Sequence, residues 1–205
     1  TDLTVTPLIA RGKGASYYIV RHTEYTSTAV TQYKLKLPTS AGELEIPQTG
    51  GSLTLNGRDS KVHVVDYDVA GKKILYSTAE VFTWKKFADY SVLVVYGNLG
   101  EHHELAVSTK AKASVLSKGD NGISTKDVKG SLVISWDVAP SRGIVKVDDL
   151  LILLLGMTPA MIAFSFDTNV FPKIATPRMN IGFRSLRPQE SRPTLRGSGP
   201  THRSL

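Results

Sequence analysis

Short segments in which apolar and polar residues alternate follow one another through the first 155 residues of the chain. Such alternation is typical of half-buried β-strands, because successive side chains of a strand point to opposite faces of a sheet. In residues 33–37, one tyrosine and two leucines would share one face and two lysines the other, and Pro38 would end the strand. Further segments of this kind are residues 16–22, 43–46, 52–55, 61–67, 74–77, 80–85, 91–96, 104–108, 131–137 and 143–147.

The connections between these segments carry residues that tolerate a positive φ angle, as in Ala70-Gly71 and residues 98–100 and 120–122. Short strands joined by such turns predict hairpins and antiparallel sheets, packed as a sandwich or a barrel-like body. Parallel pairs would need crossover helices, and the sequence indicates none. Residues 150–155 are uniformly aliphatic, so they predict either a strand covered on both faces or a short buried helix.

A different composition begins near residue 156. From there on, seven basic residues stand against two acidic ones, a net charge of +5 that leaves +2 of the formal +7 for the first 155 residues. The same stretch holds six of the ten prolines and all three methionines, whereas every tryptophan and tyrosine precedes it. We therefore predict an all-β domain over residues 1–155 and an unrelated, poorly ordered basic tail over residues 156–205.

The charge and the apolar runs exclude several classes of partner. Phe183 is the only aromatic residue from position 180 onward, so the basic tail has little on which bases could stack, and nucleic-acid binding is not expected. Residues 150–155 are much shorter than the roughly 20 apolar residues of a membrane-spanning helix. The chain has no cysteine, which removes disulfides and thiolate chemistry. It starts without an apolar leader, so we expect any signal peptide to lie upstream.

The segment Glu101-His102-His103-Glu104 attracts attention because imidazole and carboxylate groups serve as metal ligands and as acid–base catalysts. In an extended strand Glu101 and His103 would face one side, and His102 and Glu104 the other, so no three of them would converge on one ion. We interpret the segment as a solvated sheet edge or an interface with another domain.

A glycosidase needs two carboxyl groups about 5 to 9.5 Å apart. The sequence indicates no such pair, and the strand glutamates are interpreted as water-facing: Glu24, Glu43, Glu45, Glu80, Glu101 and Glu104. Some aromatic residues could stack on sugar rings, although strand aromatics more often belong to a core: Tyr17, Tyr18, Tyr67, Trp84 and Tyr96. We assign no catalytic, cofactor-binding or metal-binding residue.

Five runs form a signature longer than any short motif. They read YYIVRHT at 17–23, IPQTGGSLTLNGRDSKVHVVDY at 46–67, LYSTAEVFTWKKF at 75–87, VVYG at 94–97 and GEHHE at 100–104. Together they resemble the second domain of fungal-type β-galactosidases of glycoside hydrolase family 35, and the resemblance ends near residue 155.

This resemblance implies antiparallel sheets with an immunoglobulin-like sandwich subdomain toward the C-terminal end, packed against a separate catalytic barrel. In the family the two catalytic glutamates belong to that barrel, and no position here matches their motifs. The resemblance thus implies a non-catalytic accessory or scaffold domain of a secreted, retaining β-galactosidase that needs no cofactor, with the barrel and other domains as its partners. After residue 155 the family continues differently, so we expect a fragment or a truncated gene product.

Other functions stay open. The isolated domain could hold a galactoside or another glycan on a sheet face, as a stand-alone carbohydrate-binding β-module. A small enzyme in its own right ranks last, because no carboxylate pair is discernible. A surface that packs on the barrel in the complete enzyme would be exposed in this chain, so we also expect partial self-association.

Overall fold

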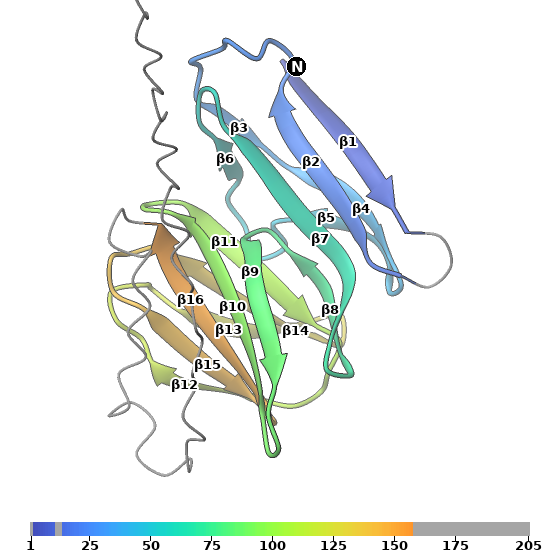
Figure 1. Ribbon diagram of the computed structural model, residues 1–205, viewed down its shortest axis with the longest axis vertical. Coiled ribbons are helices and arrows are strands. Elements are labelled where there is room, and N and C mark those ends of the chain that lie inside the picture. The colour runs from blue at the N-terminus through green and yellow to red at the C-terminus, as the bar shows by residue number, and fades with distance from the viewer. Residues whose placement is uncertain (1, 11–13, 158–205) are drawn as a thin grey trace, which may run out of the picture. The chain divides into compact units, whose positions relative to one another are not determined.

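The computed structural model describes residues 2–10 and 14–157, which form sixteen β-strands and no helix (Figure 1). The predicted all-β class is therefore confirmed. The strands are β1 (Leu3–Ile9), β2 (Ser16–His22), β3 (Thr31–Tyr33), β4 (Leu35–Thr39), β5 (Gly42–Ile46), β6 (Leu53–Leu55), β7 (Ser60–Val69), β8 (Lys72–Ser77), β9 (Glu80–Lys86), β10 (Ser91–Asn98), β11 (His102–Val107), β12 (Ala113–Ser117), β13 (Ser124–Val128), β14 (Ser131–Asp137), β15 (Gly143–Val147) and β16 (Leu150–Met157).

The strands assemble into two large sheets and two small ones. A seven-stranded sheet has the order β1-β2-β7-β8-β11-β14-β13, and a five-stranded sheet has the order β12-β15-β16-β10-β9. Strands β3 and β6 form one two-stranded sheet, and β4 and β5 form the other. The Ala70-Gly71 turn that joins β7 to β8 has positive φ at both residues, as its sequence predicted.

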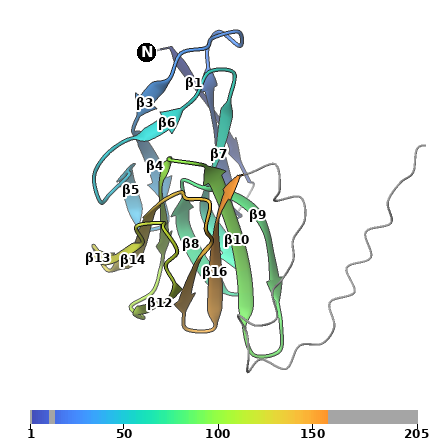
Figure 2. The ribbon, with the colours of Figure 1, turned by 90° about the vertical axis from the view of Figure 1, so that its left-hand side faces the viewer.

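The seven-stranded sheet has a hydrophobic core on each of its faces. Figure 2 labels its strands β7, β8 and β14 together with β10 and β16 of the five-stranded sheet and β5 of a small sheet. Strand β11 illustrates the principle, because Leu105 and Val107 join one core while Ala106, between them, joins the other. The first core lies between this sheet and the five-stranded sheet, and the second involves the two small sheets. The first arrangement, centred on the buried Trp136, is the predicted sandwich subdomain.

Residues 150–155 belong to strand β16, which settles the choice between strand and helix. Side chains on both faces of β16 are buried, from Leu150 at 0% to Leu155 at 9% exposure, which explains why the run does not alternate. Strand β16 pairs antiparallel with β15 but parallel with β10. The other strand pairs of the described residues are antiparallel, as predicted, and the β10–β16 pair is the exception. The chain between β10 and β16 passes through strands β11 to β15, so the crossover needs no helix.

Two further details differ from the sequence prediction. The run at 33–37 is split, because Tyr33 ends β3 and pairs with Leu53, whereas Leu35 begins β4 and pairs with Ile46. Pro38 does not end the strand but lies within β4. Strand β4 pairs only with β5 in its sheet, and a strand with one free edge tolerates a residue that lacks an N–H.

Three strands were not predicted, namely β1, β12 and β13. Each forms the edge of a large sheet and has mostly exposed side chains. The last strand, β16, extends to Met157, two residues past the predicted domain boundary. The predicted basic tail lies outside the described residues, except for its first two positions. Within residues 2–10 and 14–157, no helix is long and apolar enough to cross a membrane.

Candidate functional site

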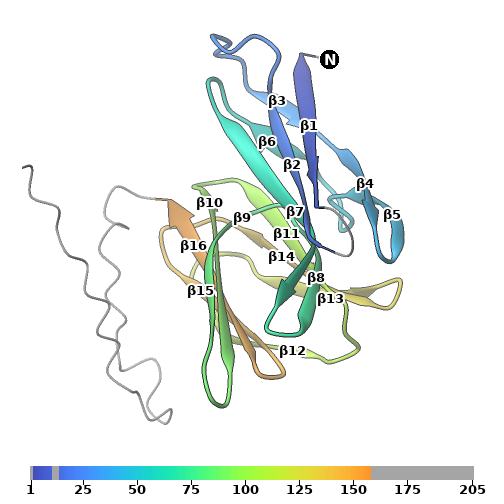
Figure 3. The ribbon, with the colours of Figure 1, turned by 45° about the vertical axis from the view of Figure 1, so that its right-hand side comes forward.

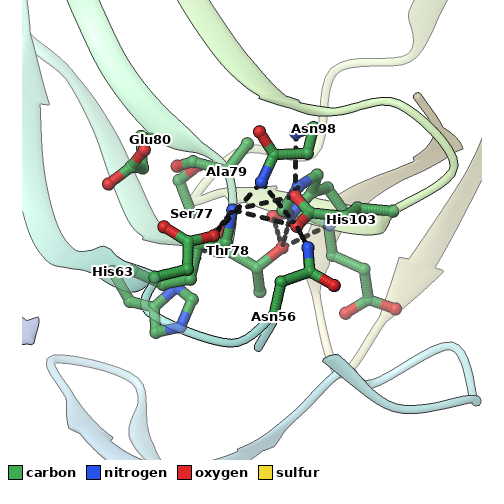
Figure 4. Close-up of polar contacts among 12 residues, drawn as sticks. Asn56, His63, Ser77, Thr78, Ala79, Glu80, Asn98 and His103 are labelled. Carbon is green, nitrogen blue, oxygen red and sulfur yellow. Dashed lines mark hydrogen bonds and ion pairs between the residues drawn. The ribbon is translucent and has the colours of Figure 1, made fainter. Parts of the chain in front are cut away.

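The Glu101 carboxylate is the centre of a buried polar cluster. Lys61 Nζ lies 2.9 Å from Glu101 Oε1, and both side chains are 5% exposed. The backbone N–H of Asn98 donates to the same carboxylate at 2.9 Å, and its side-chain amide donates at 3.0 Å. Asn56 adds a longer contact at 3.4 Å, so the cluster is approached from two sides by asparagine side chains (Figure 4). Burial alone would raise the pKa of Glu101, but hydrogen bonds from His103 and Lys61 and the lysine charge outweigh it and lower that pKa to about 2.

His103 completes this cluster as a neutral donor. Its Nε2 lies 3.0 Å from Glu101 Oε2, and its Nδ1 lies 3.2 Å from the hydroxyl of Thr78. Burial lowers the pKa of His103, more than the Glu101 carboxylate raises it. A Cβ at Gly97 would collide with His103 Nε2, so only glycine leaves room there for the imidazole ring.

His63 is held in one tautomer nearby. Its Nδ1 lies 2.9 Å from the carbonyl oxygen of Thr78, which can only accept, so Nδ1 carries the proton. Nε2 is then free to accept a hydrogen bond from the Tyr33 hydroxyl at 2.8 Å. Burial, followed by repulsion from His103, lowers the pKa of His63 to about 3. Both histidines are therefore neutral parts of the interior.

Glu104 anchors a loop. Its two carboxylate oxygens accept the backbone N–H groups of Gln48 at 2.6 Å and Thr49 at 2.7 Å. The hydroxyls of Thr49 and Tyr76 donate to the same carboxylate, the latter at 2.8 Å. The carboxylate is 0% exposed and has a donor on every side, so it serves to tie the loop to β11.

The prediction that the segment 101–104 forms a solvated edge was wrong for three of its four residues. Glu101, His103 and Glu104 are at most 5% exposed, and only His102, which pairs with Asp137 at 2.8 Å, lies near the surface. Glu101 and His103 do share one side, as the alternation predicted. In the part of the chain that the structure describes, no group of three or more histidine or acidic side chains is arranged to hold a metal ion.

An open groove of about 530 Å³ lies on the other face of β7. Because neighbouring strand residues point to opposite faces, Val62 and Val64 line the groove whereas Lys61 and His63 face the buried polar groups. Strand β2 contributes Tyr17, and strands β9 and β10 of the other large sheet contribute the remaining wall (Figure 3). The lining residues are Tyr17, Val62, Val64, Tyr67, Glu80, Val81, Phe82, Thr83, Trp84 and Tyr96.

The aromatic side chains of this groove hold one another in place as two groups. In the first, Tyr17 packs edge-on against Tyr67 with ring centroids 6.4 Å apart, and Trp84 Nε1 donates to the Tyr67 hydroxyl at 3.1 Å. In the second, Phe82 packs edge-on against Tyr96 at 6.3 Å. Phe82 and Trp84 are 59% and 38% exposed, so the rings present surface to the solvent.

Glu80 is the only carboxylate among the residues that line this groove. Its Oε1 accepts the backbone N–H of Val62 at 3.2 Å, which ties β9 to β7. Burial, the charge of the neighbouring Glu80 carboxylate and a hydrogen bond to that carboxylate raise the pKa of Tyr96 to about 12, so the phenol keeps its proton and donates it to Glu80. A second, smaller groove contains no carboxylate; it is lined by Thr49, Gly50, Gly51, His102, Ser124, Lys126 and Ser135.

The structure shows which of the aromatic residues singled out in the sequence lie in the groove and which lie in a core. Tyr17, Tyr67, Trp84 and Tyr96 come together in the groove, whereas Tyr18 is buried in the second core. Sequence reasoning missed Phe82 and Glu80 as groove residues. No sequence signal indicated them, because the partial burial of Glu80 and the exposure of Phe82 on β9 follow from the packing of the strands.

Comparisons with known proteins agree with the fold. The model of the family described as beta-galactosidase, domain 2, matches residues 1–162. The probable beta-galactosidase A of Emericella nidulans is 64% identical over 159 residues, and that of Neosartorya fischeri is 62% identical over 159 residues. Beta-galactosidase A of Aspergillus niger is 59% identical over 160 residues.

Each of these matches covers 78% of this chain but only 16% of the relative, so the chain spans a small part of the length of the curated relatives it matches. The resemblance predicted from the sequence is therefore confirmed. The chain belongs to the family of β-galactosidase second domains, the non-catalytic domain of a larger enzyme.

Proposed function

We propose that this domain serves as a scaffold in a secreted, retaining β-galactosidase, where it packs against the catalytic barrel and the other domains. The observation that carries the proposal is the match to domain 2 alone, at 59% to 64% identity. Hydrolysis of terminal β-galactosyl bonds would then depend on two glutamates of the barrel, and this domain would need no cofactor.

The distribution of exposed apolar side chains supports packing against other domains. Seven large hydrophobic residues that are exposed lie on three sheet-edge strands, β1, β9 and β12: Val5, Leu8, Ile9, Phe82, Trp84, Val115 and Leu116. An edge strand with apolar side chains is a site of association unless another element covers it. In the complete enzyme other domains would cover some of these edges, and in the isolated chain they favour self-association.

A domain replacement tests the scaffold function. Residues 1–157 would replace the matching segment of Aspergillus niger beta-galactosidase A, and the chimera would be compared with a deletion of the segment. We expect the chimera to be secreted and to hydrolyse a chromogenic β-galactoside, and the deletion to lose both properties. The purified chain alone should give no turnover. A deletion as active and as stable as the parent enzyme would contradict the scaffold function.

The division of the chain is a proposal as well. We propose that the second-domain region ends near residue 155 and that the remainder, up to residue 205, comes from a frameshift, a retained intron or a truncated gene copy. The family match ends at residue 162, before most of the basic residues of this remainder. Sequencing the transcript across the codons for residues 150–160 tests the proposal, and an intact reading frame spliced as written would overturn it.

The groove favours a second function, the binding of a galactoside or another glycan by the domain itself. Five aromatic side chains, a carboxylate and phenolic hydroxyls line one open concavity: Tyr17, Tyr67, Phe82, Trp84 and Tyr96 together with Glu80. A calorimetric titration of the chain with galactosides tests this function, and saturable heats are the expected result. Flat titrations would remove it and leave the scaffold function untouched.

A further inference from the structure

We propose that the aromatic groove binds two consecutive pyranose rings of a neutral oligosaccharide, one ring on each of its two aromatic groups. The first group consists of Tyr17, Tyr67 and Trp84, and the second of Phe82 and Tyr96 beside Glu80. This inference rests on the glycan-binding function proposed above and adds the number of sugar rings, their places and their charge.

The chemistry of the two groups matches that of a sugar ring. One face of a pyranose presents C–H groups, which carry a small positive charge, and the face of an aromatic ring is negative. Trp84 is 38% exposed and Phe82 is 59% exposed, so each group offers an accessible ring. The hydrogen bond from Trp84 to Tyr67 keeps the indole from rotating freely, so little conformational entropy would be lost when a ligand stacks on it.

The polar groups of the groove suit hydroxyls. The Glu80 carboxylate accepts hydrogen bonds from the backbone N–H of Val62 and from the Tyr96 phenol. Because a carboxylate has about four acceptor sites, it can still accept a hydrogen bond from a sugar hydroxyl. Tyr96 keeps its phenolic proton. Donors and acceptors therefore lie beside an aromatic surface, as a ring with hydroxyls around its rim requires.

The dimensions favour two rings over one. The groove volume of about 530 Å³ lies within the range of roughly 300 to 1,000 Å³ that is common for ligand sites. Phe82 and Trp84 are two positions apart on β9, and the register with β10 shifts at Phe82. Phe82 packs on Tyr96, whereas Trp84 is bonded to Tyr67, so the groove offers two separate stacking surfaces. A monosaccharide would contact one group and leave the other in water.

Charge separates this ligand from a quaternary ammonium ion, which aromatic rings and a carboxylate could also attract. A cation site closes several ring faces around one point, whereas these rings meet edge to face at interplanar angles of 71° and 81° and lie in two groups.

Titrations of the full chain with galactose, β-1,4-galactobiose and β-1,4-galactotetraose test the inference. Binding is followed by calorimetry and by tryptophan fluorescence, because Trp84 lies in the groove and Trp136 is only 1% exposed. We expect the disaccharide and tetrasaccharide to bind at least about tenfold more tightly than galactose, since an added stacked ring of about 1.4 kcal/mol gives that factor.

Three variants locate the binding. Trp84→Ala should weaken oligosaccharide binding at least about tenfold, while Trp84→Phe, which keeps a ring, should retain most of it and shows that the strand still folds. The matched control is Tyr25→Ala, because Tyr25 is 82% exposed but lies outside the groove; this variant should bind like the parent chain.

Several outcomes would overturn the inference. Equal affinity for galactose and the oligosaccharides would exclude a second ring site, while the glycan-binding function would survive. Binding that Trp84→Ala leaves unchanged would place the ligand elsewhere. Saturation by tetramethylammonium, with no response to any sugar, would identify a cation site instead. If nothing binds, the glycan-binding function fails together with this inference, whereas the domain replacement still decides the scaffold function.

Discussion

The two faces of strand β7 differ in how they use polar side chains. On one face Lys61 and His63 enter a closed set of buried charges and hydrogen bonds, in which Lys61 is only 4% exposed. On the other face Val62 and Val64 form part of an open groove lined with aromatic rings. The residue types most suggestive of chemistry, glutamate and histidine, therefore maintain the fold, and the groove relies on residue types that are common in protein cores.

The two faces differ because the buried carboxylates have all their hydrogen-bond partners within the protein, whereas the groove rings remain partly exposed. Glu101 and Glu104 have donors for both carboxylate oxygens, so neither has capacity left for a substrate or an ion. The groove rings contact one another, and Phe82 and Trp84 remain partly exposed to the solvent. The satisfied polar groups therefore stabilise the fold, and the exposed rings are the basis of the glycan binding proposed above.

The largest expected effect comes from removing one partner of the buried ion pair. Lys61→Met leaves Glu101 buried without its cation, and we expect a loss of about 3 to 5 kcal/mol in the free energy of unfolding, measured by urea denaturation. The control is Lys34→Met, because Lys34 and Glu45 are about half exposed at 3.8 Å and their pair should contribute at most about 1 kcal/mol. Equal effects of the two variants would show that the cluster does not stabilise the fold.

The same cluster predicts a dependence of stability on pH. The pKa of His63 is lowered to about 3 in the folded chain, so below about pH 6.5 the unfolded chain binds a proton that the folded chain does not. The stability is complete above pH 6.5 and decreases as the pH falls toward 3, by up to about 1.4 kcal/mol per pH unit. The lowered pKa of His103 likewise makes the fold less stable at low pH. The lowered pKa of Glu101 causes a further loss of stability as the pH falls from about 4.5 to about 2.

Urea midpoints measured from pH 8 to pH 4 check this dependence. His63→Gln keeps a neutral polar group in place of the imidazole and removes one titrating site, so the slope below pH 6.5 should become smaller. A profile that is flat from pH 8 to pH 4, or one unchanged by the variant, would contradict the neutral state of the buried histidine.

Changes on the groove face should have smaller effects on stability. Trp84→Ala removes a partly exposed ring and one hydrogen bond to Tyr67, and we expect a loss of about 1 kcal/mol in the free energy of unfolding. The measurement is the same urea titration. A loss as large as that of Lys61→Met would mean that the groove rings support the fold in the way the buried cluster does, and the contrast between the two faces would disappear.

The smallest expected effect on stability comes from a buried histidine whose ring nitrogens, unlike those of His63 on β7, make no hydrogen bond. His22 on β2 is 3% exposed, and neither of its ring nitrogens has a hydrogen-bond partner. His22→Leu removes these unpaired groups at similar volume, so the stability should stay the same or rise by up to about 1 kcal/mol. A loss above about 2 kcal/mol would show that the imidazole is as well integrated as His63.

Central strands were predictable because they alternate against a core. The ranges predicted for β2, β14 and β15 agree with the structure at both ends. Strands β1, β12 and β13 were missed because they are sheet edges with mostly exposed side chains, so the alternation that burial imposes is absent from their sequences. The parallel pairing of β10 with β16 depends on strands that lie between them in the chain, and no local pattern encodes it.

The sequence by itself determined the all-β class, most of the central strands, the family and the opposite facing of Glu101 and Glu104, because these follow from alternation and from long specific runs. Only the tertiary structure decided that both of those faces are buried. Lys61 is 40 residues from Glu101, and Gln48 is 56 residues from Glu104, so the groups that stabilise the buried carboxylates come from distant parts of the chain. The same holds for Tyr17 and Tyr18. Alternation predicts that they face opposite sides of the sheet, but only the packing of the tertiary structure shows that Tyr18 is in the second core and that Tyr17 lines the groove.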